Sequence, residues 1–243
     1  KGLGAWLGFH LGYIALAALV VWLWLQWPVL GLTGFLLISA LHFGRSDIVH
    51  TQSLIALKTY QQWLPLIAHG GLVSIAIPSM QPAAVKPLFA ILVGDEGAEM
   101  LINITGTLFL PWLLSLASYS VYAIIYPAWR KPLLSLIVLL ILVLILPPLI
   151  SFALYFCLWH SRSHTLRIWH SLEGNTERRR SFIETTVYSL IAWTAALVFF
   201  TVFQGSFSLA LIQLTFIGLA ALTVPHMLLV DIADKLKQQR LSP

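Results

Sequence analysis

Long apolar runs separated by short polar connections cover almost the whole of this 243-residue chain. A helix needs about 20 predominantly apolar residues to cross a bilayer. Runs of this length predict eight membrane-spanning helices, at residues 5–27, 29–45, 62–80, 99–128, 132–147, 149–171, 183–203 and 207–230. The sequence therefore predicts an all-α fold, a polytopic transmembrane helix bundle.

The boundary between the fifth and sixth predicted helices rests on Pro147-Pro148. Two prolines remove two backbone donors and disfavour helix in the residue before them. This predicts either a break, which gives eight spans, or only a kink within one helix, which gives seven.

Composition supports one membrane domain. Hydrophobic residues make up 59% of the chain and charged residues 9%, whereas about 25% of residues are charged in soluble domains. Because no linker or low-complexity tract interrupts the chain, we interpret residues 1–243 as a single domain. The single cysteine, Cys157, excludes an intrachain disulfide and a CxxC motif.

Basic residues divide unevenly between the two predicted sides of the membrane. With eight spans, 13 of the 14 Lys and Arg residues lie on the side of the N-terminus, and Lys86 alone lies on the other. Lys and Arg concentrate in cytoplasmic loops, so we expect a multi-pass protein of the cell membrane with both termini in the cytoplasm. The run Arg178-Arg179-Arg180 is then a topology signal or a contact for anionic lipid head groups, and the net charge of +5 does not indicate nucleic-acid binding.

Two histidines four residues apart stand near the end of the sixth apolar run, in YFCLWHSRSH at residues 155–164. Positions i and i+4 share one face of a helix, so His160 and His164 can direct two imidazoles at one metal ion. Ionisable side chains at bilayer depth are costly and usually line a cavity or a site. This pair, with Arg162 between its members, is the first candidate for the chemistry.

Two further segments carry candidate residues. In HFGRSD, at residues 42–47, Gly44 would let another helix or a ligand approach the backbone, and Asp47 could accept the second ring N–H of a ligating histidine. Taken alone, however, an aspartate in this position is more typical of a solvated helix end. In TVPHML, at residues 223–228, the helix distortion at Pro225 could turn His226 inward, or His226 could be a packing residue.

His69, before Gly70-Gly71, is interpreted as structural, and His10 and His50 are not taken as candidates.

HFGRSD, YFCLWHSRSH and TVPHML, in this order and at helix ends, resemble the Brp/Blh-type β-carotene 15,15′-dioxygenases of bacteria and archaea. The resemblance runs over nearly the whole chain. It implies an integral membrane enzyme with Fe(II) as cofactor and with β-carotene and O2 as substrates. The polyene is cleaved at its central double bond, and the two retinal molecules formed are released into the lipid bilayer, where an opsin can use them.

The resemblance also implies roles for single residues. His42, His160 and His164 match the family's iron-binding histidines. Asp47 and Arg162 are expected to contact these ligands, and His226 is expected to line the cavity or to act as a substitute ligand. The family has a further iron-binding histidine in an earlier helix, within an HGxxDH-like motif, and no residue here matches it. Since the chain opens at Lys1 rather than at a methionine, we expect that an N-terminal helix is missing from it.

Other functions remain open from the residues alone. A membrane di-iron hydroxylase or desaturase would need several histidine boxes, and this chain has one HxxxH pair. A haem-binding bundle would need axial histidines on facing helices. A transporter or assembly factor whose histidines only satisfy hydrogen bonds is compatible with the helix breaks at Pro111 and Pro147-Pro148, but no inverted repeat is visible.

Overall fold

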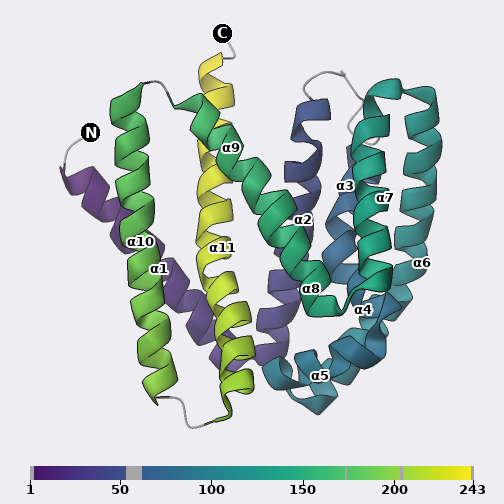
Figure 1. Cartoon of the computed structure of the whole chain (residues 1–243), viewed down its shortest axis with the longest axis horizontal. Helices are drawn as coiled ribbons and strands as arrows, with labels where there is room; N and C mark the ends of the chain where they lie inside the picture. Colours follow the sequence, from purple (N-terminus) through teal and green to yellow (C-terminus); the bar gives the residue numbers. More distant parts are fainter. Residues whose placement is uncertain (1–2, 53–61, 173, 203–204, 242–243) are drawn as a thin grey trace.

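The computed structural model describes residues 3–52, 62–172, 174–202 and 205–241, and every regular element within these ranges is helical (Figure 1). The longer helices are α1 (Leu3–Gln26), α2 (Pro28–Gln52), α6 (Asp95–Ile125), α7 (Arg130–Ile145), α10 (Asn175–Val202) and α11 (Phe207–Leu241). The shorter ones are α3 (Trp63–Gly71), α4 (Ile77–Met80), α5 (Pro82–Val93), α8 (Pro148–Ala153) and α9 (Arg162–Ser171). The predicted all-α bundle is confirmed.

Two π-helical segments join short helices into longer rods. The segment η2 (Leu72–Ala76) links α3 to α4, and η4 (Leu154–Ser161) links α8 to α9. A π-helix places its hydrogen bonds five residues apart and is often found at functional sites. The second of these segments contains His160.

Seven segments of the described chain are long and apolar enough to cross a membrane. The sixth predicted span is not among them. It is present as three short pieces, α8, η4 and α9, which follow one another without a gap, and its second half carries the polar residues of HSRSH. At its start Leu146 and Pro147 have extended backbones, each with ψ of 150°. The chain therefore reverses between α7 and α8, as Figure 1 shows, and the interpretation of this break as only a kink is wrong. The first turn of α1 and the last turns of α11 lie at the same end of the bundle.

The helix α5 was not predicted. It begins at Pro82, where a missing N–H costs no helical hydrogen bond, and it ends at Val93, followed by Gly94, whose φ of 80° suits glycine. At 12 residues it is too short to cross a bilayer. It lies across the end of the bundle opposite the termini, in the position that the sequence assigned to a loop (Figure 1).

The helices α2 and α3 approach each other closely through two glycines. A Cβ on Gly44 would lie 2.3 Å from the Leu66 carbonyl oxygen, and a Cβ on Gly70 would lie 2.1 Å from the Ala40 carbonyl oxygen. Any side chain at these positions would force the two backbones apart. The approach that HFGRSD predicts at Gly44 is thus present in the structure, and α3 is the element that makes it.

Gly70→Ala is expected to destabilise the bundle by about 1–3 kcal/mol, the usual cost of overpacking a tight contact. The matched control is Gly106→Ala on α6, because a Cβ there meets nothing within 4 Å. The free energy of unfolding of each variant is measured in detergent, with the loss of the helical circular dichroism signal as the readout. Equal stability of both variants would show that α2 and α3 can move apart without loss of stability.

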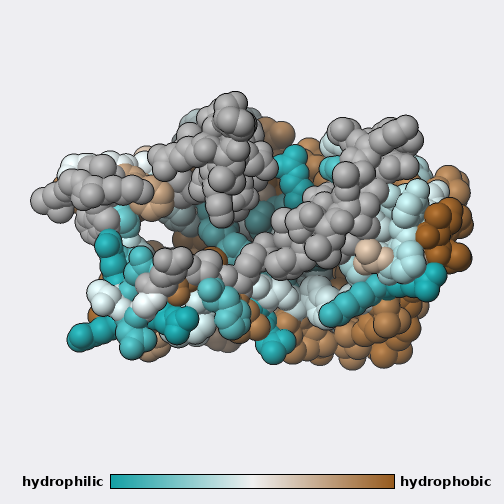
Figure 2. All heavy atoms as spheres, turned by 90° about the horizontal axis from the view of Figure 1, so that it is seen from above, coloured by the Kyte–Doolittle hydropathy of each residue, from teal (hydrophilic) through white to brown (hydrophobic). Residues whose placement is uncertain are grey.

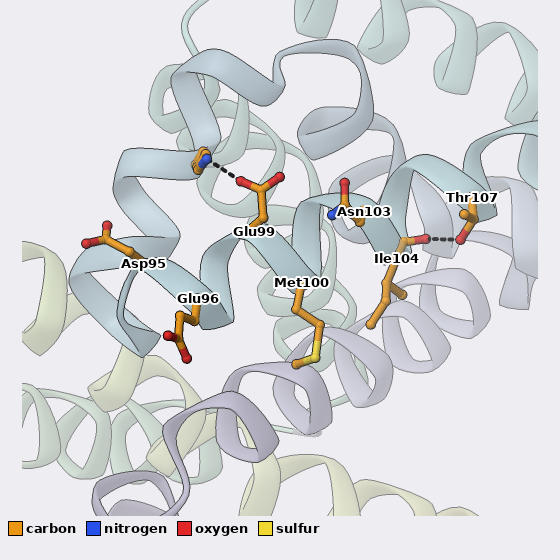
Figure 3. Close-up of a pocket in the computed structure, with 8 residues that line it drawn as sticks. Asp95, Glu96, Glu99, Met100, Asn103, Ile104 and Thr107 are labelled. Carbon is orange, nitrogen blue, oxygen red and sulfur yellow. Dashed lines mark hydrogen bonds and ion pairs between the residues drawn. The ribbon is translucent and has the colours of Figure 1, made fainter.

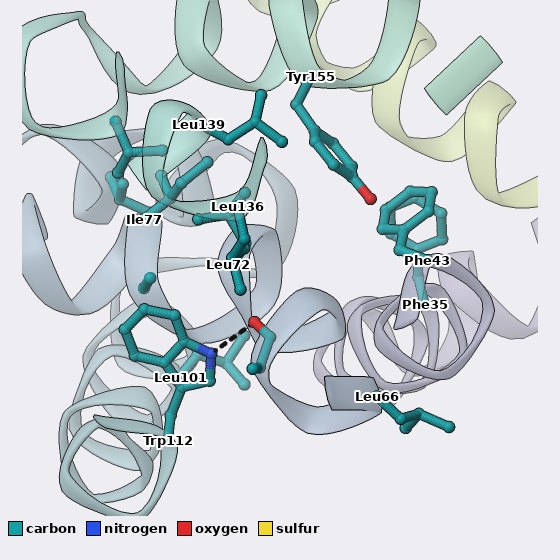
Figure 4. Close-up of a cluster of buried hydrophobic side chains, with 14 of the residues drawn as sticks. Phe35, Phe43, Leu66, Leu72, Ile77, Leu101, Trp112, Leu136, Leu139 and Tyr155 are labelled. Atoms are coloured by element: carbon teal, nitrogen blue, oxygen red, sulfur yellow. Dashed lines mark hydrogen bonds between the residues drawn. The ribbon is translucent and has the colours of Figure 1, made fainter. Parts of the chain in front are cut away.

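The buried core lies between α2, α3, α6, α7 and η4, where aromatic and aliphatic side chains interdigitate (Figure 4). The Trp112 indole N–H donates to the Ala68 carbonyl oxygen at 3.0 Å, which ties α6 to α3. By contrast, no residue of α10 is buried among those described.

The outside of the bundle carries many large apolar side chains, as a lipid-facing surface does. Figure 2 shows hydrophilic residues grouped on the end of the molecule that bears the termini, with hydrophobic residues along the sides.

Candidate functional site

Four histidines from four elements form a continuous chain of ring contacts. The ring of His160, on η4, lies 5.1 Å from that of His42, on α2, between centroids. The His42 ring lies 6.3 Å from that of His226, on α11, and the His226 ring lies 5.3 Å from that of His164, on α9. The structure therefore brings together all four histidines that the sequence singled out. We call them the imidazole cluster.

The type of these donors fits a metal ion such as iron, for which imidazole is a suitable ligand, and each neighbouring pair in the chain is spaced as two ligands of one ion would be. Imidazoles that share one ion through bonds of about 2.1 Å have ring centroids roughly 4.5–6.5 Å apart, a range that includes the three spacings in the cluster. Among the described residues, however, no group of three or more His, Cys, Asp or Glu side chains converges closely enough to form a metal site. Iron binding by His42, His160 and His164 thus stays a prediction.

Asp47 lies behind the imidazole cluster and is 6% exposed. Its Oδ1 lies 3.8 Å from His160 Nδ1, and its Oδ2 lies 3.6 Å from His69 Nδ1. The Tyr155 hydroxyl donates to Asp47 Oδ2 at 3.0 Å. Of the two interpretations of Asp47, a contact for a candidate ligand and a solvated helix end, the structure shows the buried contact.

His69 belongs to this group, although the sequence gave it only a structural role. It is 2% exposed, and neither of its ring nitrogens has a hydrogen-bond partner among the described residues. The signal that could have found it is Gly70, because the close approach of α3 to α2 that this glycine permits brings the preceding residue, His69, toward Asp47.

Tyr155 was missed for a geometric reason. Its ring stacks on that of His160, five residues later, with centroids 6.2 Å apart. In an α-helix, residues five apart point about 140° away from each other. The π-helical winding of η4 brings them to one side, and ordinary helical periodicity could not predict this.

Other candidate side chains lie elsewhere. Arg162 is exposed, and no contact with the imidazole cluster or with Asp47 is found for it in the described part of the chain. The predicted contact between Arg162 and the ligands is therefore not formed here. The hydroxyl of Tyr188, on α10, bonds to His10, away from the cluster, and His170 is exposed.

A wide, open pocket of about 850 Å³ lies at the end of the bundle opposite the termini, along the first turns of α6 (Figure 3). Its polar wall includes Asp95, Glu96 and Glu99, and Glu99 pairs with Lys86 of α5. Both members of this pair are about half exposed. Exposed ion pairs contribute little to stability. None of the candidate histidines lines this pocket.

Comparison with known proteins decides the family. A family model described as β-carotene 15,15′-dioxygenase matches residues 3–234. This chain belongs to that family. It is also 34% identical, over 226 residues, to a protein named β-carotene 15,15′-dioxygenase from the uncultured marine bacterium 66A03. The alignment covers 92% of this chain and 79% of that relative. No solved structure matches the chain.

In this family member, aromatic rings wall the imidazole cluster on the side of the bundle interior. The ring of Phe43, next to His42 on α2, lies 4.7 Å from that of His160 and 5.2 Å from that of Tyr155. Phe156 stacks against His160 from η4, with centroids 6.2 Å apart. Such a wall keeps water from one side of the imidazoles while leaving apolar surface for a hydrocarbon.

Proposed function

We propose that this protein cleaves β-carotene with O2 at the central 15,15′ double bond and forms two molecules of retinal. Family membership and the 34% identical relative of that name support the reaction. The observation that carries the proposal to particular residues is the imidazole cluster, which four elements assemble at one end of an apolar bundle. The family does not favour a di-iron hydroxylase, a transporter or an assembly factor.

His42, His160 and His164 would hold Fe(II), and His226 would line the cavity or complete the set. When bound, Fe(II) supplies the centre at which O2 reacts with the polyene. Asp47 would hold His160 in one ring orientation through Nδ1, and Tyr155 would hold the Asp47 carboxylate in turn. Phe43 and Phe156 would exclude water from the imidazoles and contact the hydrocarbon.

The surroundings of the site suit a substrate that dissolves in lipid. Large apolar side chains cover the outside of the bundle, and seven segments can cross a membrane. β-Carotene would enter from the bilayer, and retinal would return to it and reach an opsin there. The distribution of basic residues supports a place in the cell membrane with both termini cytoplasmic.

Bacterial cells that accumulate β-carotene provide the test. Cells that express the protein are expected to lose β-carotene and to gain retinal, identified by chromatography of the extracted retinoids against a standard. Cells with the empty vector serve as the control. Unchanged β-carotene in cells whose membranes contain the folded protein would contradict the proposed reaction.

A further inference from the structure

A partly open apolar cavity of about 60 Å³ lies in the bundle next to the imidazole cluster. Its wall comes from α2, η2, α4, α5, α8 and α11. Polar side chains in this wall are only those of Ser39 and Ser74. Leu149 of α8 forms part of the wall and is 40% exposed, so the cavity reaches the outer, apolar surface of the bundle.

One layer of aromatic rings separates this cavity from the imidazole cluster. Phe43 lines the cavity, and its ring lies 4.7 Å from that of His160. Phe152 also lines the cavity and stacks on Phe156 at 5.7 Å, and Phe156 stacks on His160. A small molecule in the cavity would therefore be separated from the candidate ligand His160 by the ring of Phe43.

The size of the cavity excludes β-carotene as its occupant, because sites for drug-sized ligands measure about 300–1,000 Å³. Its chemistry disfavours water, which needs two to four polar partners in a buried site. The Ser74 hydroxyl already donates to the Gly70 carbonyl oxygen at 3.1 Å. Ser39 is 3% exposed, and its hydroxyl has no partner among the described residues. One unpaired hydroxyl in an apolar wall holds a water molecule poorly.

We propose that this cavity binds dioxygen and delivers it to the imidazole cluster from the lipid bilayer. Apolar cavities of this kind stay dry and take up small apolar molecules such as xenon. O2 is small and apolar, so it enters the hydrocarbon region of the membrane, onto which Leu149 opens. The inference rests on the proposed function, because that reaction is what consumes O2 at the cluster.

Xenon tests occupancy of the cavity without any need for turnover. In crystals of the wild-type protein pressurised with xenon, we expect a xenon atom bounded by Ser39, Phe43 and Phe152. In crystals of Ser39→Leu, whose side chain fills the space, we expect none. A wild-type cavity that holds ordered water, or that stays empty under xenon, would overturn the proposal.

The dependence of turnover on O2 tests delivery. Ser39→Leu is expected to raise the KM for O2 about threefold or more and to leave the KM for β-carotene unchanged, because only access of the gas is altered. Thr186→Leu, an exposed polar-to-leucine change on α10, is the matched control and should change neither constant. Val73→Phe narrows the same cavity from η2 and should reproduce the effect if Ser39→Leu fails to fold.

The outcomes separate this proposal from the reaction on which it rests. Absence of β-carotene cleavage by the wild-type protein would contradict the proposed function. Cleavage by the wild type together with an unchanged KM for O2 in the folded, filled variants would overturn the role of the cavity alone.

Discussion

His160→Ala is expected to reduce retinal formation by more than about 100-fold while the bundle stays folded. Removing a residue that only supports a metal ligand typically costs 10–100-fold in affinity or activity, and the loss of a ligand itself should exceed this. His160 is the member of the imidazole cluster that touches most of the site, since its ring lies near those of His42 and Phe43 and its Nδ1 faces Asp47. Rates come from retinal formation by purified protein, and bound iron is measured in the same samples by mass spectrometry.

His170→Ala provides the matched control. His170 is a neighbouring histidine on α9, but it is exposed and lies outside the cluster. We expect wild-type rates, iron content and helical circular dichroism from this variant. Wild-type turnover by His160→Ala would remove this histidine from the set of ligands, and an equal loss in both variants would point to general damage of the helix.

Asp47→Asn is expected to weaken iron binding and activity by about 10–100-fold. The substitution keeps the shape of the side chain but removes the charge that faces His69 and His160. His160 then loses the carboxylate that fixes its ring orientation and increases the basicity of the ligating nitrogen. Iron affinity, measured by titration of the metal-free protein, reports this effect independently of turnover.

Tyr155→Phe separates positioning from charge at the same carboxylate. It removes one hydrogen bond to Asp47 and leaves the charge in place. Hydrogen bonds to charged groups contribute about 1.5–3 kcal/mol, so we expect weaker iron binding than in the wild type but a smaller loss than in Asp47→Asn. Wild-type iron affinity in both variants would show that the group around Asp47 supports the fold rather than the site.

Hydrophobicity was sufficient to predict the architecture, and short motifs were sufficient to predict the family. The length of the apolar runs predicted the all-α bundle, and three short motifs predicted the family, both of which are confirmed. Helix ends and helix type were harder to predict. The helix α5 was taken as a loop because a run of 12 residues is too short to suggest a membrane span. The cytoplasmic location of both termini stays a prediction.

The candidate site was predicted in part. Spacing selected His160 and His164, and the family resemblance added His42 and His226; the structure brings these four together from elements far apart in the chain. Their role as iron ligands and cavity-lining residue stays a prediction.

The positions of two residues near this cluster depend on helix winding and on the approach of two helices, which the periodicity of the sequence does not show. Tyr155 reaches Asp47 because η4 is wound as a π-helix, and His69 does so because Gly70 lets two backbones meet. Arg162 was chosen for its place between two histidines, but on this rod it is exposed.

The most direct test of the central claim is the stoichiometry of the reaction. Purified protein supplied with Fe(II), O2 and β-carotene in detergent is expected to form two molecules of retinal for each β-carotene consumed, with no other carotenoid fragment. Fragments of unequal length would contradict central cleavage, and unchanged β-carotene in the presence of folded, iron-loaded protein would contradict the reaction itself.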